Sequence, residues 1–278
     1  ATFFKYCKNI SELIVLKKRK RSAHWFYLWS LTFFRIWDDV IDLRGSAIGY
    51  LLISKRRFIY RDEKNTDDHI VQRISKNFGK KKLAPFIDFN LNLELKKIHL
   101  NNIRKLRVKH EIIIIAPSAN WIGKIWPIER FSKLIDKLKL SKRFQNPYFV
   151  IVGSREEKNK ISKLFRINNS LLYDLVGKTS LAEIYLIMKE SSLFIGNDSG
   201  LMHLAALSGV PTTGLFGPSN PKKYHPWGEE TLVIKSPKTY QQLMDYKGFD
   251  PKNIGSLMLD IDVNYVLKKI MNFPKEKK

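Results

Sequence analysis

The chain has 278 residues, of which 44% are hydrophobic, and it carries a formal net charge of +24. A chain of this length can bury two hydrophobic cores, because single cores stop growing near about 250–300 residues, and we therefore expect two domains. Its one cysteine, Cys7, excludes an intrachain disulfide and a cysteine-ligated metal cluster, and fits a reducing cytoplasmic setting.

The charge predicts attraction to polyanions, since 50 Lys and Arg stand against 26 Asp and Glu. Nucleic acid is one such partner, but the sequence has no helix-turn-helix pattern, aromatic RNA-binding motif or zinc-ligand spacing. An anionic membrane surface and a phosphorylated acceptor are two others. A coding bias toward Lys, Ile and Asn explains the charge equally well.

The first notable segment is WFYLWSLTFF, residues 25–34, which follows a basic run at residues 17–21. It is well short of the roughly 20 residues needed to span a bilayer. A basic run beside aromatic residues can hold a protein on a membrane surface, but we favour an amphipathic helix packed on an N-terminal sheet. We reject a signal peptide, because charged residues at 35–39 occupy the expected cleavage region and a strand pattern follows at 40–43.

The second half of the chain alternates strand and helix patterns. Residues 112–116 are a continuous apolar run typical of a parallel strand, Pro127 suits the first position of a helix, and residues 148–152 are the next strand. Ser180 and Glu183 have capping-box spacing and indicate a further helix start. This alternation predicts a doubly wound parallel sheet, whose ligands bind at the carboxyl ends of the strands.

The most informative segment joins a strand to an apolar helix through the loop GNDSG, residues 196–200. We expect the backbone amides of Ser199, Gly200 and the next residue to face outward at the helix N-terminus, where they favour an anion. His203, one turn into the helix, can reach the same bound group. The alternative is that Asp198 or Ser199 merely caps the helix. We expect the chain to bind a diphosphate.

Residues 197–221, NDSGLMHLAALSGVPTTGLFGPSNP, closely resemble the signature of glycosyltransferase family nine, the heptosyltransferases of the lipopolysaccharide core. That family pairs an Asp-Ser/Thr-Gly-x-x-His loop with a Gly-Pro-Thr/Ser-x-Pro loop. The resemblance covers essentially all of residues 111–228 and, more faintly, VIDLRGS at 40–46 and HIVQRISKNFG at 69–79. Its further segments are IIIIAPSANWIGKIWPIERFSKLIDKL (112–138), FVIVGSREEKNKI (149–161) and LVGKTSLAEI (175–184).

The resemblance implies an α/β fold of two Rossmann-like domains, of the GT-B type, with the N-terminal domain incomplete. We expect a partial acceptor-side domain at 1–105, a domain binding the nucleotide-sugar donor at 106–261, and a C-terminal helix and basic tail at 262–278, with Asp262 as the helix cap. The family's first strand and helix have no counterpart here, so we expect a truncated or catalytically incomplete chain.

The resemblance also assigns residues, each after a predicted strand. Lys124 binds the diphosphate and stabilises the charge of the departing nucleotide. His203 either bonds a phosphate or locks the helix to the loop. Asn120 and Thr179 match positions that line the nucleotide pocket, and Glu157 matches the acid that contacts the ribose, with Glu156 as a one-residue alternative. Asp198 orders the loop, and Ser199 and Gly200 offer backbone amides to the phosphates. Residues 217–221 match a rigid turn near the pocket.

An inverting transfer also needs a base for the acceptor proton. The resembled family places an acidic residue for this role in the opening segment that has no counterpart here. Spacing does not assign the role to Asp38, Asp39 or Asp42, so the base is unknown.

The function implied by the resemblance is inverting transfer of a sugar, a heptose from an ADP-activated donor, to a lipopolysaccharide-type acceptor. We expect no cofactor and no metal, because the signature lacks an Asp-x-Asp pair and the chain's adjacent acidic pairs diverge. The expected partners are a nucleotide-diphosphate sugar, an anionic lipid-linked saccharide and the inner-membrane surface, with the protein cytoplasmic or peripheral. The alternative is a catalytically incomplete basic scaffold that binds nucleic acid or anionic membrane.

Overall fold

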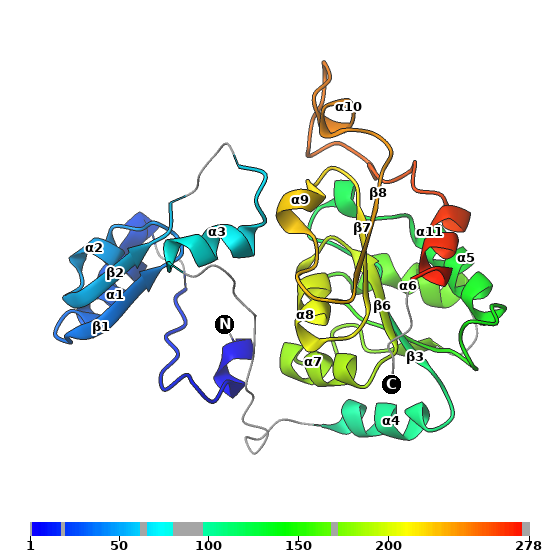
Figure 1. The fold of residues 1–278 in the computed structure, drawn as a ribbon, viewed down its shortest axis with the longest axis horizontal. Coiled ribbons are helices and arrows are strands. Elements are labelled where there is room, and N and C mark those ends of the chain that lie inside the picture. The colour runs from blue at the N-terminus through cyan, green and yellow to red at the C-terminus, as the bar shows by residue number, and fades with distance from the viewer. Residues whose placement is uncertain (1, 18–19, 62–65, 80–96, 168–171, 274–278) are drawn as a thin grey trace. The chain divides into compact units, whose positions relative to one another are not determined.

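The computed structural model describes residues 2–17, 20–61, 66–79, 97–167 and 172–273. The chain divides into two compact units, Ala1–Asn90 and Leu91–Lys278 (Figure 1). Both units combine helices with parallel strands, so the predicted α/β class is confirmed.

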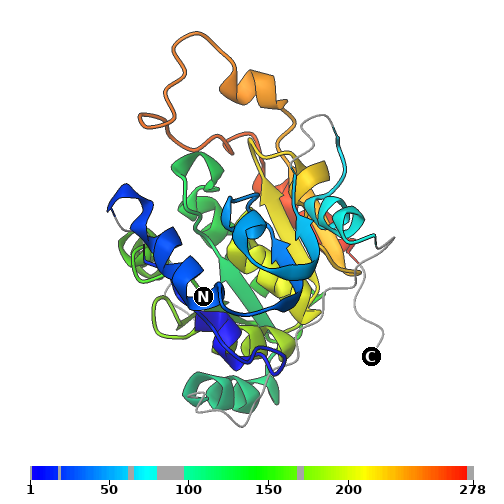
Figure 2. The same ribbon diagram turned by 90° about the vertical axis from the view of Figure 1, so that its left-hand side faces the viewer.

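The first unit is built on a two-stranded parallel sheet, which Figure 2 shows in blue. Strand β1 (Trp37–Asp42) pairs with β2 (Ser54–Ile59), and the helix α2 (Ile48–Leu51) connects them. The predicted strand at 40–43 therefore begins earlier than expected. The other elements of this unit are the 3-10 helices η1 (Thr2–Tyr6) and η2 (Lys20–Ser22) and the helices α1 (Ala23–Thr32) and α3 (Ile70–Asn77).

Helix α1 covers most of the predicted aromatic segment, and its less exposed residues Trp25, Leu28, Trp29 and Thr32 lie on one face of the helix. Thr32 is the buried residue of this helix, whereas Phe26 is 71% exposed and the following Phe34 is 89% exposed. Because its exposed face is also apolar, the helix is not amphipathic as expected, whereas its packing on the sheet stays a prediction. Of the preceding basic run, residues 18 and 19 lie outside the described residues.

The second unit contains a six-stranded, fully parallel sheet with the strand order β5-β4-β3-β6-β7-β8. Counted from β3, this order is 3-2-1-4-5-6, which is the Rossmann arrangement. The chain reverses its direction of travel across the sheet between β3 and β6. The strands are β3 (Ile112–Ala116), β4 (Tyr148–Ile151), β5 (Leu172–Asp174), β6 (Leu193–Asn197), β7 (Thr212–Phe216) and β8 (Thr231–Lys235).

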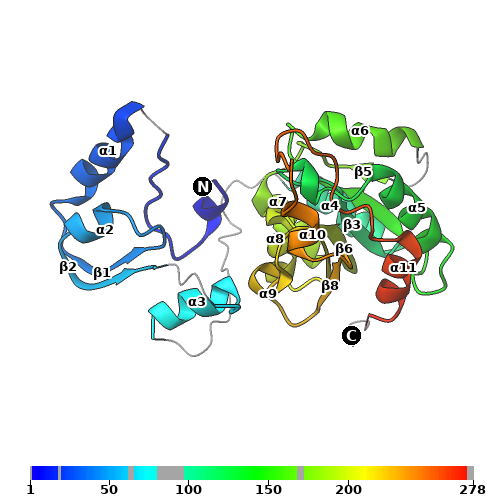
Figure 3. The ribbon, with the colours of Figure 1, turned by 90° about the horizontal axis from the view of Figure 1, so that it is seen from above.

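Helices cover both faces of this sheet, as Figure 3 shows from above. One face carries α5 (Ile128–Lys139), α6 (Lys158–Ile167) and α11 (Val263–Met271), and the other carries α7 (Leu181–Lys189) and α8 (Gly200–Ser208). Helix α4 (Ile98–Arg107) packs on α7. The short elements η3 (Ile122–Lys124), α9 (Pro221–Tyr224) and α10 (Tyr240–Met244) lie in loops.

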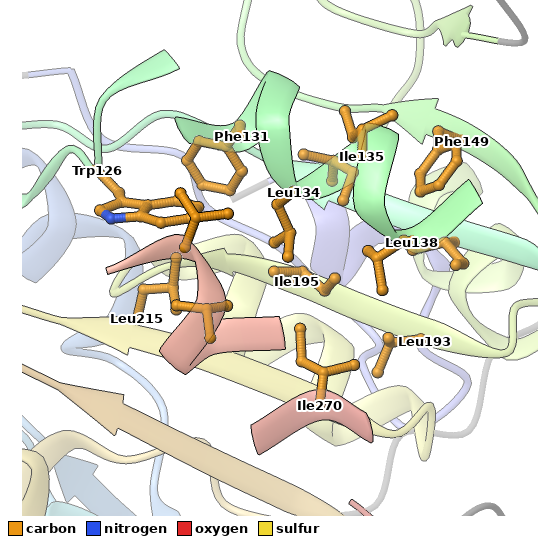
Figure 4. Close-up of a cluster of buried hydrophobic side chains, with 14 of the residues drawn as sticks. Trp126, Phe131, Leu134, Ile135, Leu138, Phe149, Leu193, Ile195, Leu215 and Ile270 are labelled. Atoms are coloured by element: carbon orange, nitrogen blue, oxygen red, sulfur yellow. The ribbon is translucent and has the colours of Figure 1, made fainter. Parts of the chain in front are cut away.

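The hydrophobic core of the second unit lies between the sheet and the face covered by α5, α6 and α11 (Figure 4). Every residue of β3, β6 and β7 is buried. Ile113 and Ile115 face this cluster, as expected for side chains two residues apart on a strand. Val266 and Ile270 bring α11 into the same core, which makes the C-terminal helix part of this unit.

The helix starts follow the predicted caps with two local differences. Pro127 is the N-cap of α5 and stands one position before the predicted one. Asp262 caps α11 by accepting hydrogen bonds from Asn264 N at 2.8 Å and Tyr265 N at 3.1 Å, which confirms its predicted role. Ser180 accepts from Glu183 N at 3.1 Å, but the Glu183 carboxylate does not close a capping box. It is buried and instead accepts from the amides that begin α4.

Candidate functional site

The candidate site lies at the carboxyl ends of the strands, where the sheet changes direction. The loop after β3 carries Asn120 and Lys124, and the loop after β6 carries Asp198 and Ser199. Because β3 and β6 are neighbours in the sheet, these two loops flank the switch point, where open α/β sheets bind ligands. The topology therefore brings the two most informative sequence segments together.

Lys124 and Asp198 join the two loops directly. Lys124 Nζ lies 2.7 Å from Asp198 Oδ2, with 29% of the lysine side chain and 7% of the aspartate side chain exposed. Because the pair is shielded from solvent, salt screens its attraction less than that of an exposed surface pair. Asp198 N also donates to Leu215 O at 3.0 Å, so the carboxylate is held at the end of β6. Asp198 therefore places a cation at the switch point.

Asn197 is a residue of this site that the sequence analysis did not single out. It ends β6 with no exposed surface, and its Oδ1 accepts a hydrogen bond from Trp126 N at 3.1 Å. The bond ties the chain just after Lys124 to the strand that carries Asp198. Asn197 Nδ2 is buried without a hydrogen-bond partner among the described residues. A polar residue at the end of a buried strand is the sequence signal that could have identified it.

The loop after β6 leads into α8 as predicted, with the helix beginning at Gly200. Ser199 is the N-cap, but its side chain makes no capping hydrogen bond, and its Oγ is buried without a partner among the described residues. The Asp198 carboxylate points to Lys124 rather than to the helix amides. A side chain added at Gly200 would meet nothing within 4 Å. The first turn of α8 is therefore open to an anion, and the simple capping interpretation does not describe it.

His203 lies one turn into α8 and interacts electrostatically with the same groups. Its pKa is lowered from the ordinary value, chiefly by desolvation, while the Asp198 charge opposes the shift and the nearby His225 and Lys124 add to it. His203 nevertheless remains exposed. Near neutral pH its imidazole is therefore held in the uncharged form, able to donate one hydrogen bond. His225, whose ring stacks with Trp227 at 5.9 Å, was not predicted as a site residue.

Three other predicted residues follow neighbouring strands without contacting this pair. Glu157 follows β4, and its Oε2 accepts from Ser154 N at 2.8 Å, which closes its own turn. Thr179 follows β5 and has a buried Oγ1 without a partner in the described part of the chain. Asn120 is exposed after β3. The structure places these residues at the same edge of the sheet as Lys124.

The loop that carries Lys124 is supported by residues 251–261, far away in the sequence. Trp121 Nε1 donates to Pro251 O at 2.9 Å, and Leu257 N donates to Gly123 O at 3.2 Å. The same stretch packs against the predicted rigid turn, since a side chain on Gly217 would come within 2.7 Å of Met258 Cγ. This support fixes the backbone around Lys124.

The acidic residues considered as a base lie in the first unit, each with a partner of its own. Asp38 pairs with Lys55 at 2.8 Å and Asp39 with Arg56 at 2.7 Å. Asp42 accepts from Arg44 N at 2.8 Å and Ser46 N at 2.5 Å within the turn after β1. Their geometry does not single out one of them as a base.

Comparison with known protein families gives a match that covers this site. Residues 44–248, more than half of the chain, match the family described as "Glycosyltransferase family 9 (heptosyltransferase)". The match includes the Lys124 loop, the Asp198 loop and every other predicted site residue.

Curated relatives and solved structures agree with this match. The chain is 30% identical to lipopolysaccharide heptosyltransferase 3 of Escherichia coli K12 over 46% of this chain and 37% of that protein. It is 27% identical to lipooligosaccharide heptosyltransferase 2 of Campylobacter jejuni over 68% of this chain and 59% of that protein. The chain thus spans about half the length of these curated relatives.

The structure of "E. coli heptosyltransferase WaaC with ADP" superposes with a TM-score of 0.62 at 17% identity, covering 91% of this chain and 78% of that one. At this identity the likeness concerns the fold, and it confirms the predicted GT-B class of Rossmann-like domains.

Proposed function

The chain belongs to glycosyltransferase family 9, and we propose that it carries the donor site of an enzyme that transfers a heptose from an ADP-activated donor to a lipopolysaccharide-type acceptor. The observation that carries this proposal is the Lys124–Asp198 pair at the switch point of the Rossmann-like sheet, beside the open N-terminus of α8. A cation and free helix amides on one edge of a sheet suit a diphosphate.

The chemistry proposed for the site follows from these charges. The acceptor hydroxyl gives its proton to a base outside these donor-site residues and attacks the anomeric carbon, the bond from that carbon to the diphosphate breaks with inversion, and the departing diphosphate gains negative charge. Lys124 and the amides of Ser199 and Gly200 stabilise that charge. The hydroxyl of Ser199 offers a further hydrogen bond. Uncharged His203 donates to a phosphate oxygen, and this role needs no metal ion.

The nucleoside end of the donor is proposed to extend along the same edge of the sheet. Asn120, Glu157 and Thr179 follow β3, β4 and β5, which are consecutive strands on one side of the switch point. Thr179 Oγ1, buried without a described partner, can bond to the nucleotide. Glu157 offers a carboxylate to the ribose, and Asn120 is exposed for contact.

The acceptor in this proposal is an anionic lipid-linked saccharide, and the net charge of +24 favours its approach and that of an anionic inner-leaflet surface. In the described ranges, no helix combines the length and apolar character needed to cross a membrane. We propose a peripheral position on the cytoplasmic side.

The test is calorimetric titration of the chain with ADP, UDP and GDP at moderate salt, with Lys124→Ala compared against Lys163→Ala. Both lysines make an ion pair, but Lys163 pairs with Glu129 on the exposed surface of α5 and α6. We expect selective ADP binding that weakens about ten- to a hundredfold in Lys124→Ala, since a hydrogen bond to a charged group contributes roughly 1.5–3 kcal/mol, and is unchanged in Lys163→Ala.

Thermal melts of both variants check that they are folded. The proposal would be contradicted if all three nucleotides bound equally, if that binding weakened with salt, and if Lys124→Ala left it unchanged. That result would favour a basic scaffold that binds nucleic acid or membrane.

A further inference from the structure

The first unit contains an apolar cavity that the donor site does not use. Its volume is about 530 Å³, and it lies between α1 and α2, which Figures 1 and 3 show side by side. The side chains that line it are almost entirely apolar: Trp25, Phe26, Trp29, Ala47, Ile48 and Leu51. Such a volume lined by hydrocarbon fits an apolar ligand rather than a sugar or nucleotide.

The polar groups of this cavity wall are not available to an occupant. Trp29 Nε1 is buried and has no hydrogen-bond partner among the described residues. Ser46, the other polar residue of the lining, already donates its hydroxyl to Asp42 at 2.7 Å. The wall therefore offers an occupant mainly hydrocarbon contact, which suits an acyl chain.

Basic side chains lie beside the cavity, and the neighbouring Asp42 carboxylate is already hydrogen-bonded to Arg44 N, Ser46 N and the Ser46 hydroxyl. The Arg44 guanidinium lies over the Trp25 ring, 5.7 Å from its centroid. Lys17 and Lys20 are exposed just before α1. No acidic residue is among those lining the cavity. An occupant that carries a phosphate or another anion next to its apolar part is therefore complementary to this region.

The surface around the cavity is also apolar. Phe26 is 71% exposed and Leu51 is 58% exposed, and both line the cavity while facing solvent. Tyr27 and Tyr50, on the same two helices, are also exposed. Aromatic residues beside basic ones are the side chains that proteins place at the boundary between lipid headgroups and acyl chains.

We propose that this cavity receives one acyl chain of an anionic lipid and thereby holds the first unit on a bilayer surface. The acyl chain enters between α1 and α2, and Arg44 with Lys17 and Lys20 contacts the headgroup. The proposal extends the peripheral membrane position of the proposed function to a defined site, and its test needs no sugar transfer.

The experiment uses vesicles of phosphatidylglycerol and phosphatidylcholine whose acyl chains carry bromine, which quenches tryptophan fluorescence on contact. The full chain is expected to bind these vesicles and to lose fluorescence as Trp25 and Trp29 meet the brominated chains. Ala47→Phe fills the cavity without changing the charge, and we expect it to abolish most of the quenching while leaving salt-sensitive binding in place.

Leu51→Glu is compared with Leu140→Glu as a matched control, because both leucines are exposed and Leu140 lies at the end of α5 in the second unit. We expect Leu51→Glu to weaken vesicle binding about tenfold or more, since a carboxylate opposes both the apolar contact and the anionic surface, and Leu140→Glu to leave it unchanged. ADP titration of each variant reports separately on the donor site.

Three results would overturn the proposal. Vesicle binding with no quenching in the unmodified chain would show electrostatic contact alone. Quenching that Ala47→Phe and Leu51→Glu leave unchanged would place the acyl contact elsewhere. A dimer in sedimentation analysis that Ala47→Phe separates, without an effect on vesicles, would assign the cavity to contact between two copies of the chain.

Discussion

The two units of this chain differ in how their strands are buried. All five residues of β3 are buried, and the same holds for β6 and β7. In β1 only Val40 is buried, and β2 has no buried residue. Val40 is also the one buried hydrophobic residue found in the described part of residues 1–90.

The difference shows where the stability of each unit comes from. In the second unit, helices close both faces of a six-stranded sheet, so the core that supports Lys124 and Asp198 is complete within that unit. In the first unit, several large apolar side chains of α1 and α2 remain exposed, among them Phe26, Leu31 and Leu51. Contact with another surface would bury them. The proposed donor site therefore depends on packing within its own unit, whereas burial of the exposed apolar side chains of the first unit depends on what that unit contacts.

The largest expected effect is a difference in unfolding free energy between a core variant of the second unit and a comparable variant of the first unit. Phe149→Ala removes a ring with no exposed surface from β4 (Figure 4), and we expect a loss of about 3–5 kcal/mol in unfolding free energy. Phe58→Ala, in β2, removes a half-buried ring and should cost less than about 1 kcal/mol. Denaturant unfolding followed by hydrogen exchange measures both. Similar costs would mean that the first unit has a core comparable to that of the second.

A smaller effect tests how tightly the second unit is packed behind the site. A side chain at Gly214 in β7 would lie 2.5 Å from Met202 Sδ of α8 and 2.9 Å from the Phe216 ring. We expect Gly214→Ala to cost about 1–3 kcal/mol, because a filled core must shift to accept a methyl group. Gly255→Ala is the control, since nothing lies within 4 Å of that position. Equal melting temperatures for the two variants would argue against tight packing.

Helix capping gives a third, still smaller contrast between the units. Ser180 caps α7 in the second unit with a 3.1 Å hydrogen bond, whereas Ser22 at the start of α1 makes no side-chain cap. Ser180→Ala should lower the unfolding free energy by about 1 kcal/mol. Ser22→Ala should change it little. Chemical denaturation of both variants measures this, and a larger loss at Ser22 would contradict the assignment.

The smallest expected effect is a pH dependence contributed by His203. Its pKa is lowered in the folded chain, mainly by desolvation, so the unfolded state binds more protons below the ordinary histidine pKa of about 6.5. Stability from uncharged His203 is therefore present above that pH and is lost as the pH falls toward the lower, folded value. His203→Gln should flatten this part of the stability profile. An unchanged slope between the variant and the parent chain would contradict the assigned shift.

Local patterns in the sequence predicted much of the second unit. Residues 112–116 form β3 as expected, and Asp262 caps α11 as expected. The loop at 196–200 lies between a buried strand and an apolar helix, although the strand and helix each extend slightly further than predicted. These features depend on residues adjacent in the chain, which is why sequence reasoning could reach them.

Contacts between residues that are distant in the sequence could not be predicted from these local patterns. Glu183 has the spacing of a capping box, yet its buried carboxylate serves the start of α4 instead. Helix α1 was expected to be amphipathic, but Phe26 and Leu31 make its exposed face apolar as well. Asn197 became visible as a site residue only through its bond to Trp126 N.

The sequence by itself determined the order of strands, loops and helices in the second unit, because apolar periodicity, glycines and caps act over a few residues. It also placed the polar site residues after strand ends. The tertiary structure decided which of these residues meet. Strand order made β3 and β6 neighbours, and only that adjacency brings Lys124 within 2.7 Å of Asp198, 74 positions further along the chain.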